Sequence, residues 1–185
     1  MRQDIPQDLA LTCRDGLPDA LRVLLEELPR AQWPEHPNFE GMVKFWLDRH
    51  LMFRQLLEIL EQDARALTDR QIDFAAFGPR LSRYGGMLLN ELHGHHQIED
   101  FHYFPHLARL DPRLEQGFAL LDNDHGAMDG LLHDMADGAN AVLQAQGAAD
   151  PLGDYHERLG RFESLLDRHL TDEEDLIVPV ILKTG

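Results

Sequence analysis

Cysteine, basic residues and long apolar runs are all scarce in this chain of 185 residues. A single cysteine, Cys13, excludes a disulfide framework and a thiolate metal cluster. Lysine and arginine number 17 against 33 aspartates and glutamates, so the formal net charge is -16. A surface this negative repels phosphate, which disfavours nucleic acid and anionic membranes as partners. No segment approaches the roughly 18 consecutive apolar residues of a membrane span.

Signals for targeting and for β-strands are missing as well. The opening segment MRQDIPQDLALTCRDG carries acidic residues and has no apolar core, so it is not a signal peptide. Together with the single cysteine, this leads us to expect a cytoplasmic protein. Alternation of apolar and polar residues with β-branched enrichment is nearly absent, so we expect no sheet.

Helical periodicity, in contrast, runs through most of the chain. Residues 1–37 are expected to form an N-terminal arm with a short helix in LPDALRVLLEEL, followed by one domain over residues 38–185. That domain contains four long amphipathic patterns, at residues 39–67, 79–108, 112–145 and 151–182. Short connections make successive helices antiparallel. We therefore predict an all-α fold, an up-down-up-down antiparallel four-helix bundle with a short N-terminal helical arm.

Histidine is unusually frequent, with 11 residues, and five of them lie in HGHHQIEDFHYFPHL at residues 93–107. The apolar stripe of each long helix contains one histidine, and two of the stripes add a glutamate one turn later. These core-facing residues are His50, His95, Glu99, His125, His169 and Glu173. Counting from the shared turns at about 1.5 Å per residue puts the first three histidines at nearly one height in the bundle.

Two readings of residues 93–107 fit helical spacing equally well, because His95 with Glu99 and His96 with Asp100 are both i, i+4 pairs. An internal repeat favours the first. The segment LLNELHGHHQIEDFHYFPHL resembles FESLLDRHLTDEEDLIVPVIL, and DRHLMFRQLLEIL resembles NDHGAMDGLLHDM. The residue that follows His169 is Leu170, so His96 has no counterpart in the second copy. We therefore expect His96 and Asp100 on a flank of the site.

Six such residues at one level suit a metal centre with two ions. Histidine and glutamate four residues apart share one helix face and can serve one centre. Buried glutamates without cations would cost several kcal/mol per charge. Nitrogen and oxygen ligands are compatible with iron, manganese or zinc. Two further candidate ligands or outer residues are His102, expected on the core face, and Asp129.

The motifs ending at His50 (DRH) and His125 (NDH), with HHQIED–YFP from His95 and HLTDEEDLIVP from His169, resemble the hemerythrin-like family, or hemerythrin HHE cation-binding domain. The resemblance covers roughly residues 38–183. It implies a four-helix bundle around a non-haem di-iron centre, with the four histidines binding iron and Glu99 and Glu173 bridging it.

The chain departs from the family's oxygen carriers, which have a second histidine where Asp129 stands. Members that repair iron–sulfur clusters have a cysteine pair, and this chain has only Cys13. We expect two iron ions, with manganese or zinc as alternatives, and a protein that binds or senses oxygen or nitric oxide or handles iron. An oxidase or peroxidase using the same centre and a structural mononuclear metal protein are the alternatives. No catalytic residue and no oligomeric state can be named.

Overall fold

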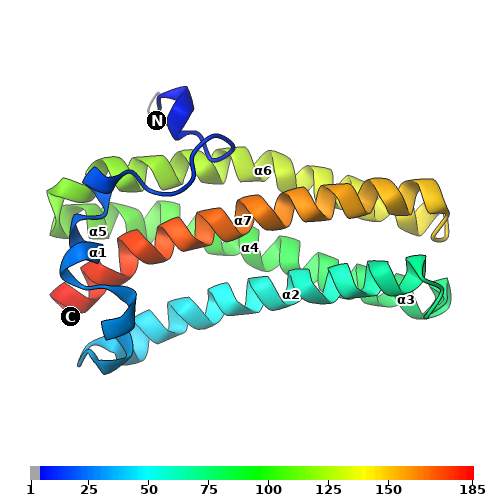
Figure 1. The fold of residues 1–185 in the computed structure, drawn as a ribbon, viewed down its shortest axis with the longest axis horizontal. Helices are drawn as coiled ribbons and strands as arrows, with labels where there is room; N and C mark the ends of the chain where they lie inside the picture. Colours follow the sequence, from blue (N-terminus) through cyan, green and yellow to red (C-terminus); the bar gives the residue numbers. More distant parts are fainter. Residues whose placement is uncertain (1–4) are drawn as a thin grey trace.

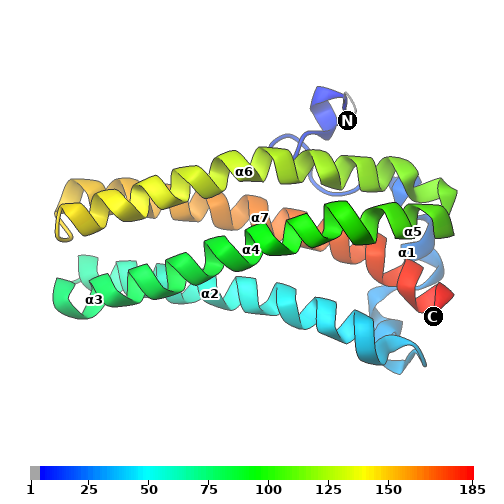
Figure 2. The same cartoon turned by 180° about the vertical axis from the view of Figure 1, so that it is seen from behind.

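The computed structural model describes residues 5–185, and all regular structure in that range is helical. The long helices are α2 (Lys44–Thr68), α4 (Gly86–Ile98), α6 (Glu115–Gln144) and α7 (Ala149–Thr184). They lie side by side along the longest axis of the molecule (Figures 1 and 2). The prediction of an all-helical bundle is therefore confirmed. None of the helices in the described part of the chain has the length and apolar character needed to cross a membrane.

The second predicted helix is a composite of five segments that continue one another. α3 (Phe74–Arg80) leads through a π-type turn, η5 (Leu81–Gly85), into α4, and a second π-type turn, η6 (Glu99–Tyr103), leads into α5 (Phe104–Leu110). Each π-type turn holds more residues than an α-helical turn. Side chains beyond η6 therefore point in directions that a constant 3.6-residue period does not predict.

Helix ends follow local sequence signals. Gly41 takes a φ of 83°, which breaks the first pattern and moves the start of the regular helix from the expected residue 39 to Lys44. Asp73 caps α3 by accepting a hydrogen bond from the Ala76 amide at 2.9 Å. Asp111 starts the 3-10 turn η7 (Pro112–Leu114) in the same way, and Gly147, with φ of 75°, closes the α6–α7 turn.

The bundle core consists of two apolar clusters separated by a polar layer. One cluster contains Phe53 and Met128, and the other contains Trp46 and Leu121. His50 lies between the two members from α2, and His125 lies between the two from α6. Both helices therefore change from apolar to ionisable side chains between the two clusters and then change back. The layer is sealed from water on both sides along the bundle axis.

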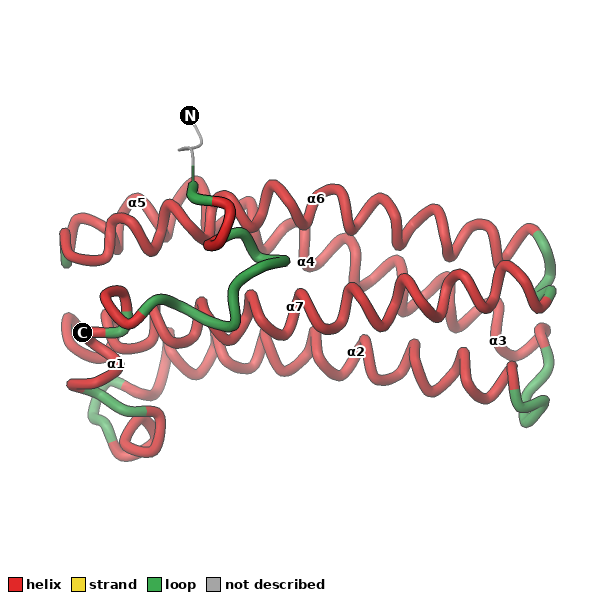
Figure 3. The backbone as a smooth tube through the Cα atoms, turned by 45° about the horizontal axis from the view of Figure 1, so that its top comes forward, coloured by secondary structure: helices red, strands yellow, loops and turns green. Residues whose placement is uncertain are grey.

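The N-terminal arm wraps one end of the bundle (Figures 1 and 3). Its elements are short: η1 (Gln7–Leu9), η2 (Asp19–Leu21), α1 (Val23–Glu27) and η3 (Arg30–Glu35). The helix expected in LPDALRVLLEEL is therefore split, with only five residues in α1. Leu17, Leu24 and Trp33 are buried and belong to the same apolar cluster as Trp46. The arm thus shares a core with the bundle.

Candidate metal centre

The polar layer holds seven ionisable side chains in two adjacent groups. Within each group, one nitrogen or oxygen atom from every member lies within 4.8 Å of the others. The first group comes from α2, α4, η6 and α7 and comprises His50, His95, Glu99 and Glu173. The second comes from α4, α6 and α7 and comprises His96, His125 and His169. The structure thus brings all six residues predicted as metal ligands together.

The two glutamates lie between the groups and direct one oxygen towards each. Glu173 Oε1 is 3.4 Å from the Nε2 atoms of both His125 and His169, while its Oε2 is 3.4 Å from His50 Nε2. Glu99 Oε1 is 3.0 Å from His95 Nε2, and its Oε2 is 3.5 Å from His125 Nε2. Each carboxylate therefore has one oxygen near a histidine nitrogen of the first group and its other oxygen near a histidine nitrogen of the second. A carboxylate placed in this way can bridge two neighbouring cations.

The nitrogen atoms of the second group also need a cation. His125 Nδ1 donates to Asp100 at 2.6 Å, and His169 Nδ1 lies 3.4 Å from Asp124 Oδ2. Because a carboxylate only accepts, each Nδ1 carries a proton, so the neutral form of each ring leaves the Nε2 lone pair for a metal ion. These two Nε2 atoms are 3.1 Å apart. Two nitrogens bound at about 2.1 Å to one metal ion are about 3.0–3.4 Å apart, so the spacing fits a shared ion.

Several buried atoms of the layer have no hydrogen-bond partner among residues 5–185. They are both carboxylate oxygens of Glu99, Glu173 Oε2 and both ring nitrogens of His96. Glu99 and Glu173 are fully buried. A buried carboxylate without compensation costs several kcal/mol. A cation that accepts these lone pairs removes that cost, so the donor set present fits a metal centre.

The pKa shifts of the buried groups also indicate that the layer needs positive charge. Burial raises the pKa of Glu99 well above its ordinary range, and the charge of Glu173 raises it further. Burial also acts to raise the pKa of Glu173, but the charge of His169 and hydrogen bonds from His125 and His169 hold it well below its ordinary value. Burial acts to lower the pKa of His169, whereas Glu173 and Asp124 raise it to about 10. Without metal, protons therefore supply the positive charge that this layer needs.

The expectation that His96 lies on a flank is wrong. Its side chain is buried, and its ring stacks on that of His125 with centroids 4.0 Å apart and planes inclined by 13°. Consecutive helical residues point about 100° apart, so His95 faces His50 on α2 while His96 faces α6. A layer that contains two groups of donors is wide enough to include both histidines, which a single apolar stripe does not predict.

His102 and Asp129, the two further candidate ligands, lie outside the polar layer. His102 was expected on the core face, but its position is exposed, because the π-type turn η6 rotates it away from the layer. Asp129 Oδ1 is 3.7 Å from Nδ1 of the exposed His93, and its side chain is 48% accessible. Neither residue belongs to the two groups.

Three carboxylates behind the histidines were not predicted as site residues. Asp100 holds His125, Asp124 holds His169, and Glu174 Oε1 accepts from His50 Nδ1 at 3.0 Å. Such partners fix the ring orientation and the tautomer of a metal-binding histidine. A signal was available for two of them, since each predicted bridging glutamate is followed directly by an acid, in ED at 99–100 and in EE at 173–174.

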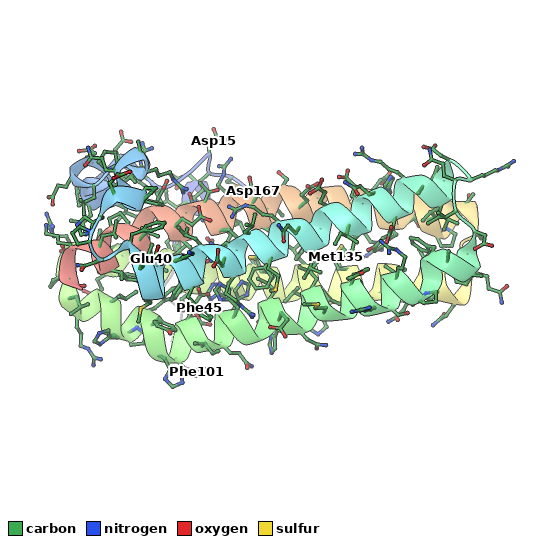
Figure 4. The ribbon with its side chains drawn as sticks, turned by 90° about the horizontal axis from the view of Figure 1, so that it is seen from below. Asp15, Glu40, Phe45, Phe101, Met135 and Asp167 are labelled. Carbon is green, nitrogen blue, oxygen red and sulfur yellow. The ribbon has the colours of Figure 1, made fainter. Side chains whose placement is uncertain are left out.

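A surface pocket of about 330 Å³ reaches the first group from outside. Its walls include His95 and Glu99 of this group together with Phe45, Trp46, Arg49, Ile98 and Tyr103. Figure 4 views the bundle from the side of α2 and α4, where the exposed Phe45 and Phe101 are labelled. The pocket gives small molecules a mostly apolar approach to the first group.

Fold and site together define a helical-bundle protein with a buried centre for cations. The chain belongs to the hemerythrin HHE cation-binding domain family, whose model matches residues 41–181. The family assignment made from the motifs is thereby confirmed, and it implies a bound metal cation. No curated protein and no solved structure matches the chain. The arm before residue 41 lies outside the match.

Proposed function

We propose that this protein holds two iron ions, bridged by Glu99 and Glu173, and uses them to bind or sense oxygen or nitric oxide or to handle iron. The observation that carries the proposal is the position of the two carboxylates. Each has one oxygen near a histidine of the first group and the other oxygen near a histidine of the second. The seven buried donors come from all the long helices. The short connections at residues 69–73, 111 and 145–148 support the up-down-up-down antiparallel order that belongs to this proposal.

The two ion positions differ in their ligands. Counting the glutamates for both, the first has two histidines, His50 and His95, and the second has three, His96, His125 and His169. His96 thus supplies the third nitrogen that the family's oxygen carriers take from the position of Asp129. The first position keeps room for an exogenous ligand, and it is the one that the pocket reaches.

Iron at these positions would supply redox chemistry towards oxygen or nitric oxide. The residues of the chain do the rest. Asp100, Asp124 and Glu174 keep the ring protons on Nδ1, so the Nε2 atoms of His125, His169 and His50 remain available as ligands. The apolar clusters on both sides keep water from entering the layer along the bundle axis.

Metal analysis tests this proposal directly. Analysis of the chain as purified identifies iron, manganese or zinc. After anaerobic loading with Fe(II), the chain is expected to hold about two ions. One tightly bound ion with no second site would instead support a structural mononuclear metal protein.

An oxidase or peroxidase that uses the same centre is the second candidate. The observation that favours it is the size of the pocket, about 330 Å³, which exceeds what a diatomic molecule needs. Aerobic turnover of the iron-loaded protein with candidate organic reductants separates the two functions. Sustained turnover supports the enzyme. Stoichiometric reaction with oxygen or nitric oxide, without turnover, supports binding or sensing.

A further inference from the structure

Arg14, from the N-terminal arm, is buried against the bundle behind one of the proposed metal-binding histidines. Its Nη1 donates to Asp124 Oδ1 at 2.9 Å and its Nη2 donates to Asp124 Oδ2. Its Nε donates to Asp172 Oδ2, also at 2.9 Å. Asp124 is the carboxylate that faces His169 Nδ1. A continuous chain of contacts therefore joins the arm to a nitrogen ligand of the second group.

Arg30, also from the arm, makes a similar connection on the other side of α7. Its Nη1 donates to Glu174 Oε2 at 2.7 Å, and its Nη2 donates to the Thr171 carbonyl at 3.1 Å. The other oxygen of Glu174 accepts from His50 Nδ1 and from Arg54 Nη1. Two histidines, one in each group, are thus held by carboxylates that arm arginines fix in place.

The third carboxylate–histidine pair provides an internal comparison. Asp100 holds His125 at 2.6 Å, and in the described part of the chain no arginine contacts Asp100. Its side chain is 23% accessible, whereas those of Asp124 and Glu174 are 3% and 7% accessible. Water can solvate Asp100, whereas the buried Asp124 is paired with Arg14 of the arm, and the buried Glu174 is paired with Arg30 of the arm and Arg54 of α2.

We propose that Arg14 and Arg30 are positioning residues of the metal centre, so that docking of the N-terminal arm and metal binding stabilise each other. This inference rests on the proposed metal-binding function. A metal ion fixes the histidine rings, the rings fix Asp124 and Glu174, and these carboxylates hold the two arginines. Because coupling between binding sites is reciprocal, an arm that is held less firmly also releases metal more readily.

The first test measures release of Zn²⁺ from the loaded full-length protein to a coloured chelator. Arg14→Gln and Arg30→Gln are each expected to speed release by up to about 10-fold, less than the 10- to 100-fold loss expected when the carboxylate that holds a metal-binding histidine is itself removed. Leu159→Ala, which removes a buried side chain from the other apolar cluster and leaves the arm untouched, serves as the control for lower stability alone. Equal acceleration by Leu159→Ala at a matched loss of Tm would overturn the inference.

A second measurement separates positioning from stability. In the Zn²⁺-loaded protein, NMR records the Nδ1 proton signals of His50, His125 and His169, the histidines that a carboxylate holds. Arg14→Gln should move the signal of His169, Arg30→Gln that of His50, and neither should move that of His125. Uniform changes in all three signals, or none, would contradict the inference.

The coupling can also be tested in the unaltered chain. Amide hydrogen exchange in α1 and around Arg14 should slow by about tenfold or more when Zn²⁺ is added, since the coupling acts in both directions. Unchanged exchange together with two bound ions would refute the coupling and leave the proposed function intact. A protein that binds no Zn²⁺ in this layer would refute both.

Discussion

The two halves of the bundle repeat one another in sequence but contribute unequally to the centre. α2 with α4 and η6 forms the first half, and α6 with α7 forms the second. Each half supplies a histidine and then a His-x-x-x-Glu pair, and the acid after each glutamate holds a histidine of the other half, in Asp100–His125 and Glu174–His50. This reciprocal bracing is what the repeat preserves.

The differences lie at positions next to the ligands. The first half has His96 where the second has Leu170, and the second has Asp124 where the first has Arg49. Arg49 pairs with Glu91 at the surface and lines the pocket, whereas Asp124 is buried behind His169. The second group therefore has a third histidine and a carboxylate bound to the arm, and the first group opens to a pocket.

Removing a glutamate that lies near both groups of ligands should abolish metal binding by the whole layer. Glu173→Ala takes away an oxygen from both ion positions, so we expect the loss of nearly all metal. Metal analysis after anaerobic loading measures this. Glu163→Gln, a partly buried change on the same helix away from the layer, should keep about two ions. Normal metal content in Glu173→Ala would refute bridging by this residue.

His96→Leu makes the first half resemble the second. Leucine matches Leu170 in the repeat, and the change removes only the second group's third nitrogen. We expect about one ion per chain in place of two, with the remaining ion held by the first group. His93→Ala, on an exposed residue of the same helix, is the control. Two tightly held ions in His96→Leu would assign His96 to packing alone.

Two carboxylates each hold a histidine of the opposite half, and their removal should lower metal affinity to different extents. Glu174→Gln removes a buried partner and leaves Arg30 and Arg54 facing a neutral amide, so Zn²⁺ affinity should fall by about 10- to 100-fold. Asp100→Asn concerns a partly exposed pair, where solvent screens the interaction, and should lower affinity by less. A competition titration with a chelator ranks the two. The reverse order would contradict the importance assigned to burial.

The sequence predicted the symmetric part of this centre and missed the asymmetric part, for physical reasons. His50 and His125 lie in regular α-helices whose 3.6-residue period identifies the core face. His102 lies inside η6, and a π-type turn leaves no mark in hydrophobic periodicity, so His102 was expected inside the site. His96 precedes this turn and lies beside the single stripe taken as the core face, so it was expected outside. Comparison of the repeats increased the error, because the copies differ at His96.

Contacts of the arm could not be predicted for a different reason. Arg14 and Asp124 are 110 residues apart, and Arg30 and Glu174 are 144 apart. The arm has no long periodic helix that would fix which side chains face the bundle. Only the folded chain brings these arginines to carboxylates that the helical pattern by itself leaves without a partner.

The smallest expected effect concerns the pocket that reaches the first group. Ile98→Trp enlarges a half-exposed side chain at its wall and should leave metal content unchanged, because Ile98 is not a ligand. It should slow the reaction of the reduced, iron-loaded protein with nitric oxide several-fold, since the gas must pass the larger side chain to reach the open position. Stopped-flow spectroscopy measures the association rate. Leu51→Trp is a matched control, since Leu51 and Ile98 are both 51% exposed and Leu51 does not line the pocket. Equal rates in both variants would mean that ligands enter elsewhere, and the difference between the two halves would then lie in their ligands alone.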